Sequence, residues 1–358
     1  MSDNFFPLVV ADVRPESTDS VSVAFAVPDD LRDKFAFTPG QHIVIKADVN
    51  GEECRRNYSL CVAPRDEEWR VAIRRVAGGR FSNWANDNIR AGDTLAVAPP
   101  HGSFTYRFDP AHAHLYAGFA GGSGITPILS LLKTALAEEP QSRFVLCYGN
   151  RATANVMFLE QLAELKDLYL DRFQLIHILE QEEDEIALFN GRLDAEKLGQ
   201  LFPAIIDPAE IDAAFICGPA PMMEAVSSTL RMVGVPEDHI LVEHFLAEPP
   251  SADQLAAMEK LKQQSSGRSV TLVMDGRRRL VEFDPAKGSI LENARAAGLP
   301  APFACKAGVC ATCRARVVEG EVAMAVNYGL SKEETDHGYV LTCQSIPLTD
   351  KVVLDYDG

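Results

Sequence analysis

The stretch "PFACKAGVCATC", from Pro302 to Cys313, places three cysteines within nine residues. They are spaced Cys305-x4-Cys310-x2-Cys313, and 29 residues separate the last of them from Cys343. A zinc ribbon normally offers two close cysteine pairs, whereas this chain has one C-x2-C pair and a lone distal cysteine. C-x4-C-x2-C with a distant fourth cysteine is typical of plant-type 2Fe-2S proteins. The sequence therefore predicts that these four cysteines bind a 2Fe-2S cluster.

The composition is that of a globular chain of two or three domains, with 358 residues, 47% of them apolar. The N-terminus lacks the basic and apolar regions of a signal peptide, and eight cysteines are too few for a disulfide framework. We therefore expect a cytoplasmic protein with reduced thiols. The net charge is −17, and residues 109–246 carry 21 acidic against 8 basic side chains. This balance argues against nucleic acid or anionic membrane as a partner.

The strand pattern changes along the chain and predicts several domains. Residues 1–108 hold short apolar or alternating runs separated by Gly, Pro, Asn and Asp, which indicates a small antiparallel barrel. In residues 109–246 strands alternate with helical segments, which predicts a doubly wound parallel α/β sheet. Residues 247–268 resemble a linker with one or two helical turns, and residues 269–358 open with a hairpin turning at Asp275-Gly276. The expected barrel strands are Ser20–Val27, Gln41–Val49, Arg55–Val62, Trp69–Val76, Thr94–Pro100 and Ser103–Phe108.

A glycine-rich loop, "AGGSGITPILSLL" from Ala120 to Leu132, follows the first strand of the α/β region. Gly122 and Gly124 would let the backbone approach a pyrophosphate at the start of the next helix. A site for NAD would place an acid after the second strand, but that position holds Arg151, which suits the 2′-phosphate of NADP. Arg192 is a weaker second candidate, and an ordinary surface role is the alternative for Arg151.

Several motifs, in order, make the whole chain resemble the ferredoxin–NADP reductase superfamily. "RNYS" (Arg56 to Ser59) is similar to the R-x-Y-S flavin signature of that superfamily. "PGQH", "GGRFS", "GSGITP", "CGPAPMM" and "EHF" follow or flank it where the family has them. The domain order most resembles the reductase components of multicomponent phenylacetyl-CoA epoxidases. The resemblance implies a Greek-key flavin barrel, an NADP-binding α/β domain and a β-grasp plant-type ferredoxin domain.

The resemblance also assigns flavin contacts. Arg56 would pair with the pyrophosphate, Tyr58 would lie against the isoalloxazine ring and Ser59 would place a hydroxyl near N5. The helix that opens at Gly79 would present its N–H groups to the pyrophosphate, which favours FAD; FMN is the alternative. The full predicted flavin set is Arg56, Asn57, Tyr58, Ser59, Ile73, Arg74, Gly79, Phe81 and Ser82.

The predicted nicotinamide contacts lie at strand ends, where open α/β sheets bind ligands. The set is Gly122, Gly124, Thr126, Arg151, Arg192, Cys217, Gly218, Pro219 and Phe245, with Ser59, Cys217 and Glu243 as the catalytic candidates. For Cys217 and Phe245, core packing is the alternative interpretation.

We therefore predict an NADPH-dependent reductase that passes electrons through FAD and a 2Fe-2S cluster to a partner. By resemblance, that partner is the di-iron oxygenase of phenylacetyl-CoA epoxidase. The alternatives are a reductase for a Rieske-type oxygenase or another redox metalloenzyme, and a redox sensor without enzymatic activity. Lys306 and Arg314, which flank the cluster ligands, are expected to form a small cationic docking contact.

Overall fold

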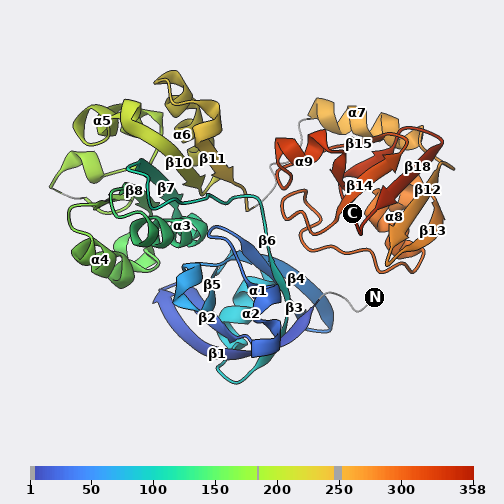
Figure 1. Cartoon of the computed structure of the whole chain (residues 1–358), viewed down its shortest axis with the longest axis horizontal. Coiled ribbons are helices and arrows are strands. Elements are labelled where there is room, and N and C mark those ends of the chain that lie inside the picture. The colour runs from blue at the N-terminus through green and yellow to red at the C-terminus, as the bar shows by residue number, and fades with distance from the viewer. Residues whose placement is uncertain (1–4, 184, 246–251) are drawn as a thin grey trace. The chain divides into compact units, whose positions relative to one another are not determined.

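The computed structural model describes residues 5–183, 185–245 and 252–358. Phe6–Cys54 and Tyr58–His244 form one compact unit, and Phe245–Gly358 forms the main part of another (Figure 1). Residues 246–251, with the Pro249-Pro250 pair at the start of the expected linker, lie outside the described residues.

The N-terminal part is a six-stranded sheet in the order β4-β3-β6-β1-β2-β5. A bridge between Leu60, just after β4, and Val71 of β5 joins the two edge strands and closes the sheet into a barrel. Alternate positions point inward and are apolar, as a closed barrel requires. The strands are β1 (Phe6–Ser17), β2 (Ser20–Ala26), β3 (His42–Val49), β4 (Glu52–Ser59), β5 (Trp69–Arg74) and β6 (Thr94–His101), with the helices α1 (Arg32–Phe35) and α2 (Arg80–Asn88).

One strand of the barrel was missed, and one expected strand is absent. The long first strand β1 was not predicted; its ladder with β2 is interrupted by register shifts between Val10 and Asp12 and between Pro15 and Ser17, which obscure the alternation. Ser103–Phe108 was predicted as a strand, but it forms none. Its aromatic side chains instead enter the core of the following domain, where Tyr106 packs edge-on against Tyr116 at 5.5 Å between ring centroids.

The next part is the predicted doubly wound sheet, with five parallel strands in the order β11-β10-β7-β8-β9. One apolar cluster joins α3 and α4 to one face of the sheet, and a second joins α5 and α6 to the other face. The chain reverses its direction of winding between β7 and β10, which is where such sheets bind ligands. The elements are β7 (Leu115–Gly121), α3 (Ile125–Glu138), β8 (Arg143–Asn150), α4 (Leu159–Leu168), β9 (Phe173–Leu179), α5 (Ala195–Ala204), β10 (Ile211–Cys217), α6 (Ala220–Met232) and β11 (Ile240–Glu243).

The C-terminal part is a mixed sheet in the order β13-β12-β18-β14-β16. Its first and last strands, β12 and β18, pair in parallel at the centre, and α8 packs into its core, which confirms the β-grasp fold. The predicted hairpin at Asp275-Gly276 is present, and Ser289 caps α8 by accepting a hydrogen bond from the Glu292 N–H. The elements are β12 (Ser269–Met274), β13 (Arg277–Glu282), α8 (Ile290–Ala296), β14 (Arg314–Glu319), β15 (Val322–Met324), α9 (Lys332–Asp336), β16 (Tyr339–Leu341), β17 (Ser345–Pro347) and β18 (Lys351–Asp355).

The expected linker contains a helix, α7 (Ala252–Gln263), that is longer than the one or two turns predicted. Met258 and Leu261 of this helix pack against the core of the C-terminal domain. The helix therefore gains stability from tertiary contacts that its own sequence does not reveal.

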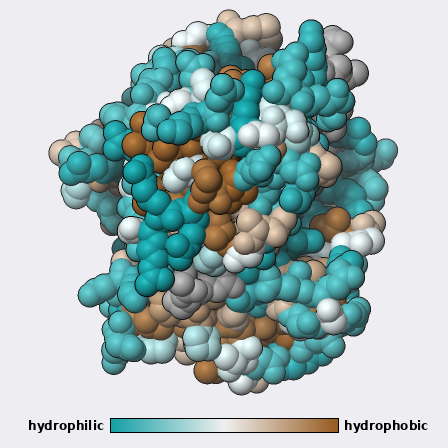
Figure 2. Space-filling view, turned by 90° about the vertical axis from the view of Figure 1, so that its right-hand side faces the viewer, coloured by the Kyte–Doolittle hydropathy of each residue, from teal (hydrophilic) through white to brown (hydrophobic). Residues whose placement is uncertain are grey.

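One face of the molecule and the character of its helices bear on membrane association. Figure 2 shows a face that is mainly hydrophilic, with apolar side chains gathered in separate patches. Among the described residues, none of the helices combines the length and the apolar character needed to span a membrane.

Candidate functional site

The predicted flavin signature lies along β4. Arg56 is exposed and its Nη1 donates to the carbonyl of Arg55 at 2.8 Å, whereas Ser59 is buried. Asn57 and Tyr58 between them are half-buried. Tyr58 lies beside Phe81 of α2, with 5.8 Å between the ring centroids. The structure thus brings an aromatic ring of the barrel wall next to the helix that was predicted to bind the pyrophosphate.

The start of α2 requires glycine at residue 79. A side chain there would place its Cβ 2.6 Å from Ser82 Oγ and 3.0 Å from the Val76 carbonyl oxygen. Ser82 Oγ in turn accepts a hydrogen bond from the Val76 N–H at 3.1 Å, so this hydroxyl is already used to shape the loop. The helix N-terminus therefore offers main-chain N–H groups to an anion, while the Ser82 side chain holds their geometry.

Ile73 and Arg74, the two predicted flavin contacts on β5, differ in burial and in their hydrogen bonds. Ile73 is fully buried, and its carbonyl accepts a hydrogen bond from Asn86 Nδ2 at 3.0 Å, so a flavin contact at this oxygen would be shared. Arg74 closes β5, and its Nε donates to Asp19 Oδ2 at 3.0 Å. Its side chain thus faces the turn between β1 and β2.

The glycine-rich loop of the nucleotide domain is pressed against the end of β10. A Cβ on Gly124 would lie 2.0 Å from the carbonyl oxygen of Cys217, and one on Gly121 would lie 2.6 Å from Pro219 Cδ. Glycine is therefore required at both positions by close packing of two strand ends. Thr126 is buried, and its Oγ1 donates to the Ser123 carbonyl at 3.0 Å, which fixes the first turn of α3.

Strand pairing gathers the nicotinamide candidates at one edge of the sheet. Cys217 pairs with Ala120 of β7 on one side and with Glu243 of β11 on the other. Because the strands are parallel, the glycine loop, the segment Cys217–Pro219 and Glu243 all lie at the same carboxyl edge. Phe245, two residues after β11, is 39% exposed, so within the described residues it is not a core side chain.

Removal from water changes the acidity of this edge. Burial raises the pKa of the Glu243 carboxyl to about 8, and burial also raises the pKa of the Cys217 thiol well above its usual value, with the nearby Glu243 adding to the effect. Glu243 therefore holds a proton near neutral pH, and Cys217 stays a neutral thiol. A protonated carboxyl beside a strand-end ligand site can donate a hydrogen bond or a proton.

Two residues near the glycine loop were missed by the sequence interpretation. Tyr148 is fully buried, and its hydroxyl donates to the Gly122 carbonyl at 2.9 Å and accepts from the Met157 N–H at 3.3 Å. Asn150, at the end of β8, is about nine-tenths buried; its side chain lies near the Tyr148 hydroxyl, but neither of its polar atoms makes a well-formed hydrogen bond to the described residues. A carboxamide in that state suits a ligand contact. The alternation Tyr148-x-Asn150 at the end of a buried strand is the signal that could have identified both.

Both predicted 2′-phosphate arginines already bind carboxylates. Arg151 Nη2 lies 3.1 Å from Asp19 Oδ2, and Arg192 Nε donates to Glu180 Oε1 at 2.9 Å. The Arg192 side chain is 73% exposed, against 53% for Arg151. No acidic residue directly follows β8 in the sequence, but the fold places the carboxylate of Asp19, from the barrel, beside Arg151.

The four predicted cluster ligands come together in the C-terminal domain. Cys310, Cys313 and Cys343 are buried and Cys305 is half-buried. The Cys305 N–H donates to Cys310 Sγ at 3.4 Å, and the thiol of Cys310 raises the pKa of Cys305. The side chain of Cys343 raises the pKa of Cys313 in the same way. Thiols this close share protons, and a metal cluster would displace them.

The cluster loop curls in a way that suits 2Fe-2S. Lys306, Gly308 and Ala311 all have positive φ, at 55°, 77° and 51°. A Cβ on Gly308 would lie 3.0 Å from the Val326 carbonyl oxygen. The loop also turns N–H groups toward sulfur, since the Ala307 N–H donates to Cys305 Sγ at 3.3 Å. Four thiols with inward N–H donors fit a plant-type 2Fe-2S cluster.

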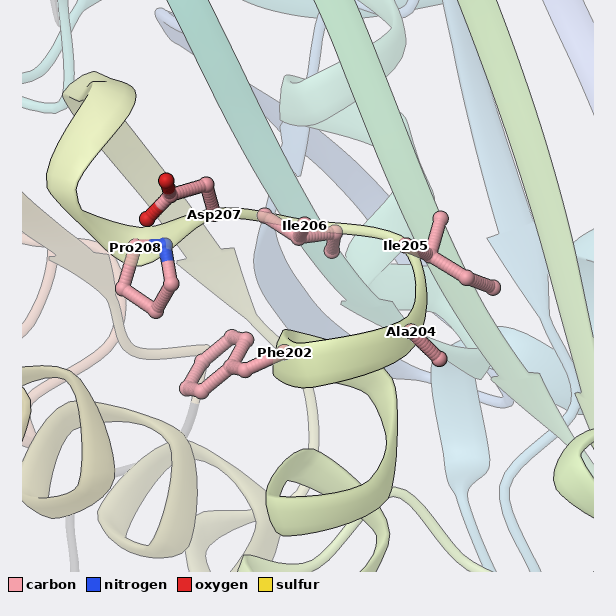
Figure 3. Close-up of a pocket in the computed structure, with 6 residues that line it drawn as sticks. All are labelled: Phe202, Ala204, Ile205, Ile206, Asp207 and Pro208. Carbon is pink, nitrogen blue, oxygen red and sulfur yellow. The ribbon is translucent and has the colours of Figure 1, made fainter.

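Two other features of the described structure are not part of this site. His112, His114 and Glu139 lie close enough to consider a metal, but the Glu139 carboxylate already accepts hydrogen bonds from four protein groups. The two imidazoles stack at 4.1 Å with only 22° between their planes, so their lone pairs do not converge. The surface pocket in Figure 3 lies at the end of α5 and contains none of the predicted site residues; it is lined by Phe202, Ala204, Ile205, Ile206, Asp207 and Pro208.

Comparison with known proteins assigns each part of the chain to a domain family. Residues 7–106 match an oxidoreductase FAD-binding domain, residues 119–228 an oxidoreductase NAD-binding domain, and residues 272–348 a 2Fe-2S iron-sulfur cluster binding domain. The predicted flavin, nicotinamide nucleotide and 2Fe-2S domains are confirmed, and FAD is favoured over FMN.

Curated relatives match along almost the whole chain. A component of the 1,2-phenylacetyl-CoA epoxidase of Escherichia coli (strain K12) is 43% identical over 354 residues, which are 99% of this chain and 98% of that protein. The ferredoxin reductase component of 3-ketosteroid-9-alpha-monooxygenase of Rhodococcus rhodochrous is 36% identical over 354 residues, 98% of this chain and 96% of that protein. The solved structure of phthalate dioxygenase reductase, 24% identical, covers 99% of this chain and 98% of its own with a TM-score of 0.58, so the two share a fold.

Proposed function

The chain belongs to the family of ferredoxin–NADP reductase-type fusion proteins that serve as oxygenase reductases, and we propose that it uses NADPH to supply electrons to the di-iron oxygenase of a phenylacetyl-CoA epoxidase. The strongest support for this proposal is the 43% identity to a phenylacetyl-CoA epoxidase component along 99% of the chain. We take the domains as residues 1–108, 109–246 and 269–358, with 247–268 as the linker.

When bound, FAD would supply hydride acceptance and the 2Fe-2S cluster would supply one-electron transfer. The chain positions these groups. In the proposal, Arg56 neutralises the FAD pyrophosphate together with the N-terminus of α2, and Tyr58 and Ser59 face the flavin ring. Cys305, Cys310, Cys313 and Cys343 are the ligands of the cluster.

The strand ends of the nucleotide domain hold the coenzyme in this proposal. Gly122 and Gly124 allow the backbone to approach its pyrophosphate, while Thr126 and Cys217–Pro219 border the nicotinamide. Glu243, protonated near neutral pH by its raised pKa, donates a hydrogen bond or a proton at this edge. Arg151 binds the 2′-phosphate of NADPH, with Arg192 as a weaker and more exposed contributor.

A second acceptor class has its own support. The relative that is 36% identical is the reductase component of a ketosteroid monooxygenase, so the domain order alone does not select the oxygenase. Reconstitution separates the two: with NADPH, the chain should support turnover of phenylacetyl-CoA by the epoxidase oxygenase and at least about tenfold slower turnover by a ketosteroid oxygenase. Equal rates with both would contradict the proposed partner.

The redox-sensor alternative is tested without any partner. Sustained NADPH oxidation with a one-electron dye would establish turnover. A single stoichiometric reduction that then stops would instead favour a sensor.

A further inference from the structure

The turn between β1 and β2 of the barrel is anchored on the nucleotide domain. The Thr18 N–H and Oγ1 both donate to the Ala154 carbonyl at 3.1 Å, and Asn155 Nδ2 donates to Thr18 Oγ1 at 3.3 Å. Ala154 and Asn155 belong to the loop that follows β8 and begins with Arg151. The turn is therefore held against the segment that carries the proposed 2′-phosphate cation.

Asp19, at the tip of this turn, is shared by two arginines. Its Oδ2 accepts from Arg74 Nε at 3.0 Å and from Arg151 Nη2 at 3.1 Å, and its Oδ1 accepts from Ser17 Oγ at 2.9 Å. The Asp19 side chain is 22% exposed, so these bonds fix a partly desolvated carboxylate. One negative charge thus lies between two positive charges.

Arg74, one of the two arginines bound to Asp19, also contacts the glycine-rich loop. A Cβ on Gly122 would lie 2.4 Å from Arg74 Nη1, so the Arg74 guanidinium packs directly on that glycine. Asp19 is thereby tied through Arg74 to the loop that would meet the pyrophosphate, and directly to the cation that would meet the 2′-phosphate. Asp19 is therefore linked to both groups that are proposed to meet phosphates of NADPH, the glycine-rich loop and Arg151.

We propose that Asp19 is a specificity-determining residue of the coenzyme site, because its carboxylate competes with the 2′-phosphate of NADPH for Arg151. This inference rests on the proposed role of Arg151. A 2′-phosphate, with close to two negative charges, has to displace Asp19 from Arg151 before it can bind that guanidinium, whereas the neutral 2′-hydroxyl of NADH does not need this cation. Acids at this place in NAD-type sites come from the end of the second strand; here the acid comes from the barrel.

The other carboxylates near this loop have their own partners. Glu180 pairs with Arg192, and Glu182 accepts from the Thr153 N–H and Oγ1 at 2.7 and 2.6 Å. Among the described residues, the carboxylate in direct contact with Arg151 is that of Asp19, whereas Glu180 pairs with Arg192 and attracts Arg151 only from a longer distance. The effect is therefore assigned to Asp19 and not to the general acidity of the domain.

The test compares Asp19→Asn with a matched control, Asp66→Asn. Asp66 binds Lys133 of α3 across the same two domains, and its side chain is 26% exposed, close to the 22% of Asp19. Titration calorimetry on the FAD-loaded protein should show NADP⁺ and 2′,5′-ADP binding about five- to twentyfold more tightly to Asp19→Asn, with NAD⁺ within about twofold. Asp66→Asn should leave the ratio of NADP⁺ to NAD⁺ affinity unchanged. An unchanged ratio in Asp19→Asn would overturn the inference.

A double-variant cycle separates this inference from the proposed function. If Arg151→Ala weakens NADP⁺ selectively and Asp19→Asn then has less than about a twofold effect in that background, both stand. If Arg151→Ala is selective but Asp19→Asn strengthens NADP⁺ equally in both backgrounds, competition for Arg151 is wrong and the 2′-phosphate assignment survives. If Arg151→Ala weakens NADP⁺ and NAD⁺ equally, the 2′-phosphate assignment itself fails. Should Asn at residue 19 lower the FAD content, Asp19→Ser repeats the test with the same expected direction.

Discussion

The cluster loop and the coenzyme edge are built in opposite ways. The loop that holds Cys305, Cys310 and Cys313 spans nine residues, and three positive φ angles impose its shape locally. The coenzyme edge is assembled from strand ends and a barrel turn, and Asp19 and Arg151 that meet there are 132 residues apart. A ligand set within one loop should fail as a whole when one ligand is lost. A site built from several elements should lose only part of its affinity or selectivity when one residue is substituted.

The largest effect is expected at the cluster. Cys310→Ser should abolish the visible 2Fe-2S absorption and electron delivery to the oxygenase. The substitution leaves only three thiolates for the cluster, and Cys310 is buried, so no outside ligand can easily replace it. Reduction of the flavin by NADPH should survive. Cys54→Ser, at a buried cysteine of the barrel, is the control and should retain the cluster absorption. Tetrahedral zinc in anaerobically purified protein would contradict the 2Fe-2S assignment.

The flavin site should show the next largest effect. Arg56→Ala should lose FAD during purification, because the pyrophosphate would lack its main cation. The measurement is the ratio of extracted FAD to protein, with Arg65→Ala, at an exposed arginine of the same domain, as the control. Recovery of FMN from the unmodified chain would instead show that the helix start at Gly79 does not bind a pyrophosphate.

The coenzyme edge should respond selectively. Arg151→Ala should weaken NADPH binding by about 1.5–3 kcal/mol, the size of a charge-assisted hydrogen bond, and leave NADH nearly unchanged. Arg143→Ala is the control, because Arg143 lies at the other end of β8, is 56% exposed and pairs with Glu210 at 3.0 Å, against 53% and 3.1 Å for Arg151. Equal losses of NADPH and NADH would make Arg151 a structural residue.

Glu243 should make stability depend on pH. Its pKa rises from 4.5 to about 8 on folding, so between these values the folded chain binds more protons than the unfolded chain. The free energy of unfolding should therefore fall as pH rises through this window, by on the order of 2 kcal/mol for a half-buried carboxyl. Glu243→Gln should lack this fall, measured as the urea midpoint of the FAD-loaded protein at pH 6 and pH 8.5. Glu237→Gln, at an exposed acid paired with Arg231, should keep the wild-type slope; if Glu243→Gln keeps it too, the carboxyl is ionised when folded.

The smallest effect is expected at the cluster surface. Lys306 and Arg314 were predicted as docking cations, but Lys306 Nζ lies 2.9 Å from Glu292 and Arg314 Nη1 lies 2.6 Å from Glu334. Their charges are partly neutralised, so Lys306→Gln should slow electron delivery to the oxygenase by only about two- to fivefold at low salt, and less at high salt. Lys287→Gln, which removes a lysine paired with Asp284, is the control. Equal slowing with a small dye would indicate damage to the loop.

Several parts of the fold could be read from the chain because their signals are local. The parallel strands are continuous apolar runs, and the hairpin at Asp275-Gly276 and the Ser289 cap depend on neighbouring residues. Where contacts with residues distant in the sequence set the secondary structure, the prediction failed. Ser103–Phe108 alternates like a strand, yet its aromatic side chains are used by the next domain, and α7 is lengthened by contacts of Met258 and Leu261 with a core that follows it.

The sequence by itself determined the positions of the four cysteines proposed as cluster ligands, the three domain types and the position of the glycine-rich loop, because each depends on residue types at short, fixed spacing. Only the tertiary structure decided the charge at the coenzyme edge. No spacing rule connects Asp19 to Arg151, Glu180 to Arg192 or Glu292 to Lys306. Ion pairs and burial depend on which elements the fold brings within a few ångströms, and that information is absent from any short stretch of the chain.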